Sequence, residues 1–413
     1  MVVEPQLFET VEDRRAPSEW TRLLRSPMQS RLREVCFFIH RWVGAVLALY
    51  MLVISLTGVS LVFHDELSEW ACPSPAVKVL STKISYAKIV ENSEAAYPGY
   101  KVTGLIVPDE ESQPIDVFAL KGDNERINCQ VDPYSGTVIG LKTKNAVLET
   151  LRDLHFNLFA GKTGRMVNGA GGLLLALLSI TGVVAWWRGV AKWLNGFKMS
   201  FRGSTKRVNW SVHSALGIWV LPFLLLQATS AFYFGFPNFI EQNLNKIAPV
   251  SNQKKIEEPT ASKLANEGSS SESGSTRPGL EPDIDKLISI ARQNAGSNSA
   301  VFRIAFPDKR RHSVRIWLKN SMETNENAPT TQVFMAPKTG QVLAVSTAEA
   351  PPTGDQIITW LIKLHFGTFA GTISKCAWLF VGLTPAILSL TGLFLFANGI
   401  AARREKKSEL RRL

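Results

Sequence analysis

The sequence LHFNLFAG at residues 154–161 precedes an apolar run that ends in SITG at residues 179–182. The same pattern recurs as LHFGTFAG at residues 364–371, before an apolar run that ends in SLTG at residues 389–392. The spacing from the histidine to the threonine is identical in the two copies, without a gap. The chain is therefore organised around a duplicated unit that couples a histidine to a long hydrophobic segment.

Four segments of the 413-residue chain are long and nearly uncharged: 36–63, 166–187, 209–236 and 375–397. A helix needs about 20 consecutive apolar residues to cross the hydrocarbon core of a bilayer. Each segment meets this length and is more apolar than a typical core helix. The sequence therefore predicts a mainly α membrane protein with four transmembrane helices.

Basic residues are concentrated next to these segments. The net charge is +11, and the loop 188–208 contains several basic residues and no acidic one. The N-terminal lead, 1–35, and the tail, 398–413, are also rich in arginine or lysine. Short basic flanks remain in the cytoplasm, so both termini are expected inside and the long loops 64–165 and 237–374 outside. Contact with anionic membrane lipid accounts for the excess charge, and no nucleic acid partner is expected.

The two long loops repeat one α+β pattern. Helical spacing at Tyr86–Ala96 and at Ile284–Asn294 precedes strand-like segments, and Gly136 and Gly340 close similar turns. In the second loop a polar linker at 251–282 comes first. The predicted strands are Asp116–Leu120, Ile127–Val131, Thr137–Leu141, Val301–Phe306, Ser313–Leu318, Gln332–Ala336 and Gln341–Val345.

The whole chain thus reads as one unit used twice: a helix leading out, an outer α+β domain, a helix bearing a histidine, and a helix leading in. His40 and His213 are each followed by glycine at the same offset. Because both halves start on the same side, they form parallel repeats related by a pseudo-two-fold axis along the membrane normal. This symmetry predicts His40 and His213 at one depth near the cytoplasmic face, and His155 and His365 at another near the outer face.

Two symmetry-related histidine pairs favour a ligand. A single histidine in a membrane often only bonds across helices, but two imidazoles facing each other across a helix bundle can ligate a b-type haem. Two haem b groups per chain, held by His40 with His213 and by His155 with His365, would form an electron path. Arg41 is placed to meet a haem propionate, or to anchor the helix at the interface. Zinc fits less well because it usually has four ligands, while a copper or proton-relay site remains an alternative.

Other histidine and cysteine residues leave further alternatives. His64 lies at the outer edge of the first span and could replace His155 or His365 as a ligand. Cys72 and Cys129 both fall in the first outer loop, where an oxidising compartment permits a disulfide, although their spacing gives no further support. No C-x-x-C-H motif is present, so covalent c-type haem is not indicated.

The chain resembles the PepSY-associated transmembrane family, the iron-regulated inner-membrane proteins of bacteria. The resemblance is carried by His40-Arg41-Trp42 with Gly44, by Thr57-Gly58, by Leu154-His155-Phe156, and by the outer α+β units, which look like PepSY domains. Residues 228–231 read Ala-Thr-Ser-Ala where SxTG would be expected, so the third span departs from the pattern. The resemblance implies a di-haem protein of the bacterial inner membrane, with two periplasmic loops, similar to the ferric-siderophore reductases of the family.

The sequence supports three functions. The first is an electron-transfer protein that reduces a ferric siderophore or another Fe(III) chelate during iron uptake. Its donor would be a quinol or a cytoplasmic partner, since no dinucleotide-binding motif follows any strand. The second is a non-enzymatic PepSY protein that binds peptides or regulates a protease. The third is a component of a siderophore permease.

Overall fold

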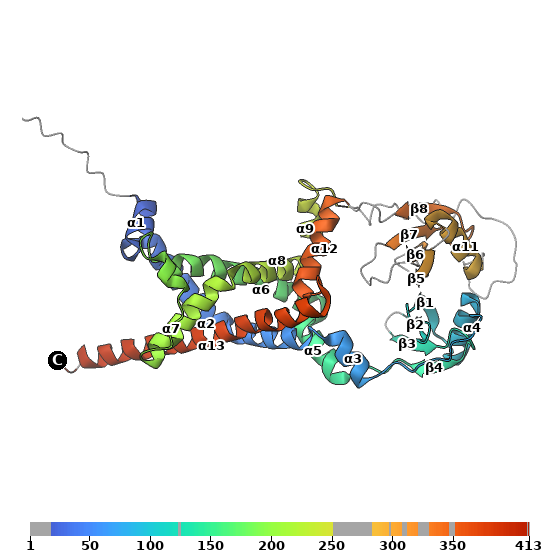
Figure 1. Cartoon of the computed structure of the whole chain (residues 1–413), viewed down its shortest axis with the longest axis horizontal. Coiled ribbons are helices and arrows are strands. Elements are labelled where there is room, and N and C mark those ends of the chain that lie inside the picture. The colour runs from blue at the N-terminus through green and yellow to red at the C-terminus, as the bar shows by residue number, and fades with distance from the viewer. Residues whose placement is uncertain are drawn as a thin grey trace, which may run out of the picture. The chain divides into compact units, whose positions relative to one another are not determined.

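The computed structural model describes residues 18–122, 125–250, 283–296, 299–307, 312–320, 330–346, 352–410 and 412 (Figure 1). The chain divides into two compact units. The helical unit comprises Met1–His64, Val147–Ile240 and Thr359–Leu413, and the sheet unit comprises Asp65–Ala146 and Glu241–Ile358. The predicted linker at 251–282 lies outside the described residues.

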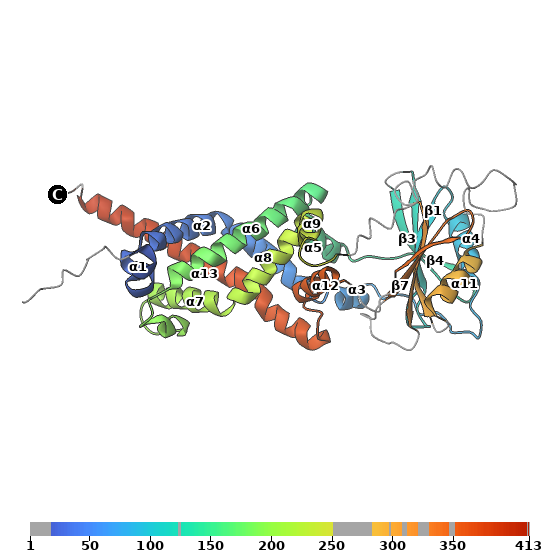
Figure 2. The same ribbon diagram turned by 90° about the horizontal axis from the view of Figure 1, so that it is seen from above.

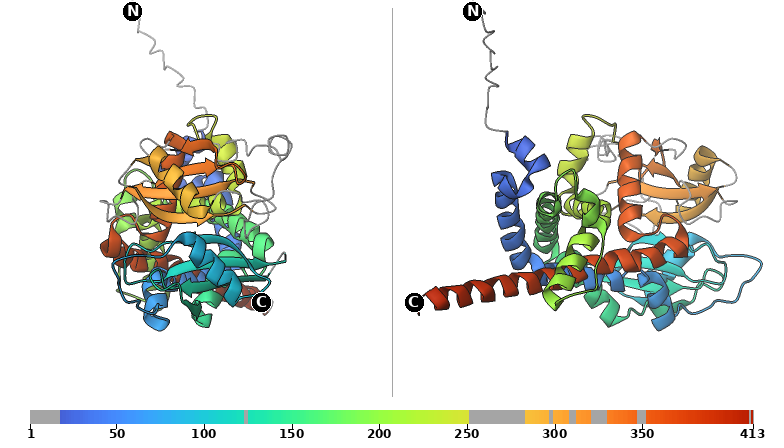
Figure 3. Two further views of the ribbon diagram at one scale, coloured as in Figure 1. Left: turned by 90° about the vertical axis from the view of Figure 1, so that its right-hand side faces the viewer. Right: turned by 60° about the vertical axis from the view of Figure 1, so that its left-hand side comes forward.

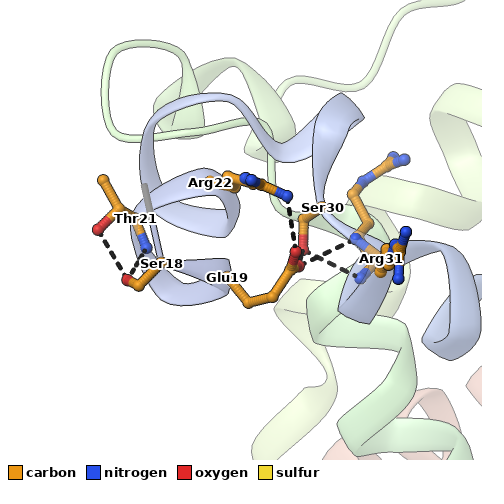
Figure 4. A network of polar contacts seen from close by, with 7 residues as sticks. Ser18, Glu19, Thr21, Arg22, Ser30 and Arg31 are labelled. Atoms are coloured by element: carbon orange, nitrogen blue, oxygen red, sulfur yellow. Dashed lines mark hydrogen bonds and ion pairs between the residues drawn. The ribbon is translucent and has the colours of Figure 1, made fainter. Parts of the chain in front are cut away.

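A short N-terminal helix, α1 (Glu19–Arg25), is fastened to the start of the first long helix, α2 (Arg31–Ser60). The Ser18 hydroxyl caps α1 by accepting from the Thr21 N–H at 3.2 Å. The Glu19 carboxylate accepts from the Arg31 N–H at 3.0 Å and from the Ser30 hydroxyl at 3.3 Å (Figure 4). The first N–H groups of a helix lack partners within the helix, so this carboxylate stabilises the N-terminus of α2.

Among the residues that the structure describes, three helices are long and apolar enough to cross a membrane: α2, α6 (Gly161–Trp186) and α13 (Gly371–Leu410). They cover three of the four predicted spans, and α13 continues beyond residue 397 to Leu410. Together with α8 (Leu221–Gly235) they run side by side through the helical unit (Figures 1 and 2).

The third predicted span, 209–236, is not one straight helix. It is divided into α7 (Thr205–Trp219) and α8 (Leu221–Gly235), which meet at a bend of 65°. Pro222 lies in the first turn of α8, where its missing N–H costs nothing, whereas in a continuous helix it would break a hydrogen bond. The described chain therefore has three membrane-spanning helices, or four if this bent pair counts as one span.

Two shorter helices lead into α6 and α13: α5 (Ala146–Asn157) and α12 (Thr353–Phe366). α5 ends at Asn157, and Gly161 begins α6. Leu158 and Phe159 make the turn with φ of 49° and 56°, a left-handed conformation that is uncommon for residues other than glycine. Two further short helices are α3 (His64–Ala71) and α9 (Pro237–Leu244).

In the sheet unit, the strands from both long loops form one antiparallel sheet with the order β4-β3-β2-β1-β5-β6-β7-β8. β1 pairs with β5, with Gly104 opposite Ala305, and so joins the two sets of four strands. β1 is the one strand of the eight that the sequence patterns did not predict. The strand bounds are Lys101–Ile106, Ile115–Lys121, Glu125–Val131 and Val138–Leu141 for β1 to β4, and Ser299–Ala305, Val314–Asn320, Thr330–Met335 and Val342–Ser346 for β5 to β8.

The predicted helices α4 (Tyr86–Ala96) and α11 (Ile284–Ala295) cover the same face of this sheet (Figures 2 and 3). Buried residues of both helices and of both strand sets form one hydrophobic core, which includes Leu105, Leu287 and Ile316. The α+β pattern of each loop is thus present, and the two patterns share a core. Cys72 and Cys129, which could have paired, are both free.

The turn before β4 is held by its own side chain. The Asp132 carboxylate accepts from the Tyr134 N–H at 2.8 Å and from the Ser135 hydroxyl at 2.7 Å. Partial burial raises the pKa of Asp132, but these hydrogen bonds outweigh burial and hold the pKa below its usual value. Gly136 supplies the positive φ, 72°, that the turn requires.

Candidate functional site

The histidines of the helical unit form two levels. At the first, which we call the His40 level, His40 of α2 and His213 of α7 face each other with ring centres 6.2 Å apart and ring planes at 78°. These residues are remote in the sequence, and the packing of α7 and α13 against α2 and α6 brings them together.

At the second level, the His155 level, His155 of α5 and His365 of α12 line one cavity of about 340 Å³. The size falls within the range of about 300–1,000 Å³ that is usual for small-molecule sites. The remaining walls come from α2, α6, α8 and α13 and are mostly apolar; among them are Met51, Ile54, Leu175, Phe234, Val381 and Pro385.

The two levels are far apart along the same helices. His40 lies in the first half of α2, and Thr57, which contacts His155, lies near the end of that helix. At a rise of about 1.5 Å per residue, the distance along α2 from His40 to Thr57 is about 25 Å. The levels therefore span most of the roughly 30 Å thickness of a hydrocarbon core.

Each histidine is held by a hydroxyl group of a neighbouring helix. The Nδ1 atoms of His40, His155, His213 and His365 lie 3.4, 3.1, 2.8 and 2.6 Å from the hydroxyl oxygens of Thr181, Thr57, Thr391 and Ser230, respectively. Thr57, Thr181 and Thr391 are the threonines of the repeated SxTG motif. Ser230 occupies the position that seemed to depart from the motif, and it makes the same contact.

The hydroxyl protons determine which nitrogen of each histidine carries hydrogen. Each of the four hydroxyls donates to the backbone carbonyl four residues earlier, at 2.7–2.8 Å. A hydroxyl has only one proton, so a hydroxyl that donates to its carbonyl accepts from the histidine Nδ1–H. The Leu178 and Ile54 carbonyls, each 3.0 Å from Nδ1 of His40 and His155, require the same tautomer because carbonyls only accept. All four neutral imidazoles thus carry their lone pair on Nε2.

A glycine follows the threonine at three of these contacts. A Cβ on Gly58, Gly182 or Gly392 would lie 2.8, 3.0 or 3.2 Å from Cε1 of His155, His40 or His213, respectively. The absence of a side chain at these positions lets each ring approach the helix that carries the hydroxyl. At His365 the corresponding residue is Ala231, which follows the smaller Ser230.

Comparison with known proteins agrees with this architecture. The family model for the PepSY-associated TM region matches residues 37–398, which include both histidine levels and the sheet unit. The chain belongs to this family. None of the curated proteins searched matches it. The spans and the family together make it a membrane protein in a lipid environment.

In this PepSY-associated TM protein the two sides of the His155 level differ in polarity. The Tyr50 hydroxyl donates to Asn168 Oδ1 at 2.9 Å, and Asn168 Nδ2 donates to the His155 and Phe156 carbonyls at 2.7 and 3.1 Å. On the His365 side an aromatic pair, Phe223 and Trp378, takes the corresponding place, with ring centres 5.8 Å apart. The cavity therefore has one hydrogen-bonded wall and one aromatic wall.

Arg165 adds a positive charge to the polar wall. It lines the cavity and donates to Asn157 Oδ1 at 3.2 and 3.4 Å. A ligand with an anionic edge would be favoured on this side of the cavity by charge.

Arg41, the remaining predicted site residue, lies beside His40 in sequence and packs on α13. Its guanidinium is 5.2 Å from the Phe396 ring centre, and a Cβ added at Gly399 would lie 3.2 Å from its Nη2 atom. This contact is compatible with an interface anchor, and the expected meeting with a propionate stays a prediction.

His64 and His312 do not join the two levels. His64 Nε2 lies 3.9 Å from the Glu149 carboxylate, at the start of α3, and His312 belongs to the sheet unit. Within the part of the chain that the structure describes, no three His, Cys, Asp or Glu side chains gather as a metal site would require.

Sequence reasoning recognised the four histidines but missed the four hydroxyls. The signal lies in two constant spacings. His40 and Thr57 are as far apart in the sequence as His213 and Ser230, and the same holds for His155 with Thr181 and His365 with Thr391. Tyr50 and Asn168 gave no pattern, because their roles depend on where α5 ends.

Proposed function

We propose that this PepSY-associated TM protein holds two b-type haems, one at each histidine level, and carries electrons across the membrane to an Fe(III) chelate. The observation that supports this function is the arrangement of the four imidazoles. They form two pairs at two depths, and every Nε2 is left with a lone pair by hydrogen bonds at Nδ1.

The donor set fits such a group. Two imidazoles that would share one metal atom, each through a bond of about 2.0 Å, need ring centres within roughly 6 Å of each other. The 6.2 Å separation of His40 and His213 agrees with this distance. When held by these imidazoles, haem b would supply reversible one-electron transfer between Fe(III) and Fe(II), at a potential that depends on its ligands and their hydrogen bonds.

The residues around the His155 level would hold, orient and shield the group. His155 and His365 would hold its iron, and Arg165 on the polar wall would face an anionic edge. Phe366 packs against Phe156 and Phe234, with ring centres 6.3 and 5.9 Å apart, and all three line the cavity. These rings would exclude water and lower the local dielectric around the site.

The same contacts support the pseudo-symmetric halves that the sequence repeat predicts. Each half contributes one histidine to each level, and each histidine donates to a hydroxyl of its own half. With basic flanks inside, we place the His40 level near the cytoplasm of the bacterial inner membrane and the His155 level near the periplasm.

In this orientation electrons from a quinol or a cytoplasmic donor would reach an Fe(III) chelate, such as a ferric siderophore, on the periplasmic side. One electron converts chelated Fe(III) to Fe(II). Fe(II) binds hard oxygen ligands less tightly, so the reduction releases iron from the chelate.

The test is a pyridine haemochrome assay on the protein purified from membranes, with a reduced-minus-oxidised spectrum. We expect two haems per chain in the wild type and one in each of the His40→Ala, His155→Ala, His213→Ala and His365→Ala variants. His312→Ala, in the sheet unit, is the matched control and should retain two.

A spectrum without b-type bands would contradict the proposal and favour the peptide-binding or protease-regulating role. If His64→Ala loses one haem while His155→Ala retains two, the ligand at the outer level is His64 and not His155.

A further inference from the structure

The four histidines are not equally supported at Nδ1. His40 and His155 each have a backbone carbonyl 3.0 Å from this nitrogen in addition to the threonine hydroxyl. At His213 and His365, by contrast, a hydroxyl is the one acceptor that the described residues place at Nδ1: Thr391 at 2.8 Å and Ser230 at 2.6 Å, respectively.

This difference matters because a neutral imidazole has one N–H, and the hydrogen bond at one nitrogen decides which nitrogen keeps a lone pair. Ser230 is fully buried, and its own proton goes to the Leu226 carbonyl at 2.8 Å. It is therefore held as an acceptor. Without it, nothing among the described residues would keep the proton on Nδ1 of His365 and the lone pair on Nε2.

We propose that Ser230 is a positioning residue that alone selects the ligating tautomer of His365, whereas backbone carbonyls share this task at His40 and at His155, its partner in the same level. The inference rests on the proposed haem function, because it concerns how a ligand is presented to that group. A hydrogen bond from Nδ1–H also raises the basicity of the imidazole, so the loss of Ser230 would weaken the ligand and raise the reduction potential of its level.

The central experiment compares Ser230→Ala with Thr57→Val in the full-length protein purified from membranes. Loss of an outer-shell partner typically costs about 10–100-fold in metal affinity. We expect haem retention at the His155 level to fall by about 10–100-fold in Ser230→Ala, and by clearly less in Thr57→Val, where the Ile54 carbonyl remains. The midpoint potential of that level should rise in the same order.

Two further variants separate positioning from packing. Thr229→Val is the matched control, since Thr229 is the exposed neighbour of Ser230 and donates only to the Leu225 carbonyl. It should behave as wild type. The double variant Ser230→Thr with Ala231→Gly recreates the Thr57-Gly58 pair. Its haem retention and the midpoint potential of the His155 level should equal those of the wild type.

The tautomer can also be read without the cofactor. Selective ¹⁵N labelling of histidine and NMR in detergent distinguish a protonated Nδ1 from a protonated Nε2. In apoprotein, His365 should be protonated on Nδ1 in the wild type and shift toward Nε2 in Ser230→Ala, while His155 remains unchanged in both.

The possible failures are distinguishable. A wild type without haem would overturn the proposed function, and an unchanged His365 tautomer in Ser230→Ala would overturn this inference. Haem in the wild type, with equal retention and potential in Ser230→Ala, would overturn the inference alone. If Ser230→Ala does not fold, Ser230→Cys replaces it, because a thiol is only a weak acceptor; wild-type behaviour of that variant would count against the role of Ser230.

Discussion

Replacing Gly58 with alanine should displace His155 from its hydroxyl partner. The new Cβ would lie 2.8 Å from Cε1 and 3.4 Å from Nδ1 of His155. Carbon atoms in contact prefer about 3.5–4.0 Å, so the ring must retreat by roughly 0.7–1.2 Å. The bond from Nδ1 to Thr57 is already 3.1 Å, and such a shift takes it beyond hydrogen-bonding distance.

The expected energy follows from two opposing effects. Overpacking of this kind costs about 1–3 kcal/mol, while alanine in a helix is favoured over glycine by about 1 kcal/mol. Gly44→Ala on the same helix is the matched control, because its Cβ would only meet Leu178 at an ordinary 3.7 Å. Gly44→Ala should therefore be neutral or stabilising, and Gly58→Ala should be less stable than it by about 1–3 kcal/mol.

The assay is reversible unfolding in mixed detergent, with the haem content of each variant measured in parallel. Gly58→Ala should also lose haem at the His155 level while Gly44→Ala retains it. If the two variants unfold at the same free energy and hold the same haem, the close approach of His155 to α2 has no role, and the reasoning is refuted.

Three other changes test the surrounding structure. Asn168→Leu leaves the carbonyl of His155 without its donor and should cost about 1–3 kcal/mol of unfolding free energy; an unchanged value would show that water replaces the amide. In Gly104→Val the added Cβ would lie 2.8 Å from the Ile304 carbonyl oxygen, so amide exchange of β1 and β5 should accelerate, and unchanged exchange would contradict the continuous sheet. Asp132→Ala should destabilise the protein at pH 7. The depressed pKa of this carboxyl means that its contribution is full above the ordinary pKa and is lost as the pH falls through the lower folded value. The difference from wild type should therefore shrink below pH 3.8, and a difference that stays constant with pH would exclude the carboxylate as its source.

The sequence by itself determined the features that depend on neighbouring residues. Uninterrupted apolar runs mark α2, α6 and α13, because a helix must satisfy its own backbone in lipid. Alternation and turn residues such as Gly136 mark seven of the eight strands. The duplicated histidine unit also indicated which histidines belong in pairs. The threonine of each unit does not contact the histidine of the same unit: Thr181 contacts His40, and Thr391 contacts His213.

Only the tertiary structure decided how these pieces meet. β1 and β5 join into one sheet because the edges of the two strand sets bond to each other, and edge pairing leaves no local pattern in sequence. The bend before Pro222 divides a run that hydropathy reads as one span. Ser230 stands where the SxTG motif has threonine, and helix packing places its hydroxyl against His365. The contact requires a hydroxyl oxygen at that position, which serine and threonine both supply.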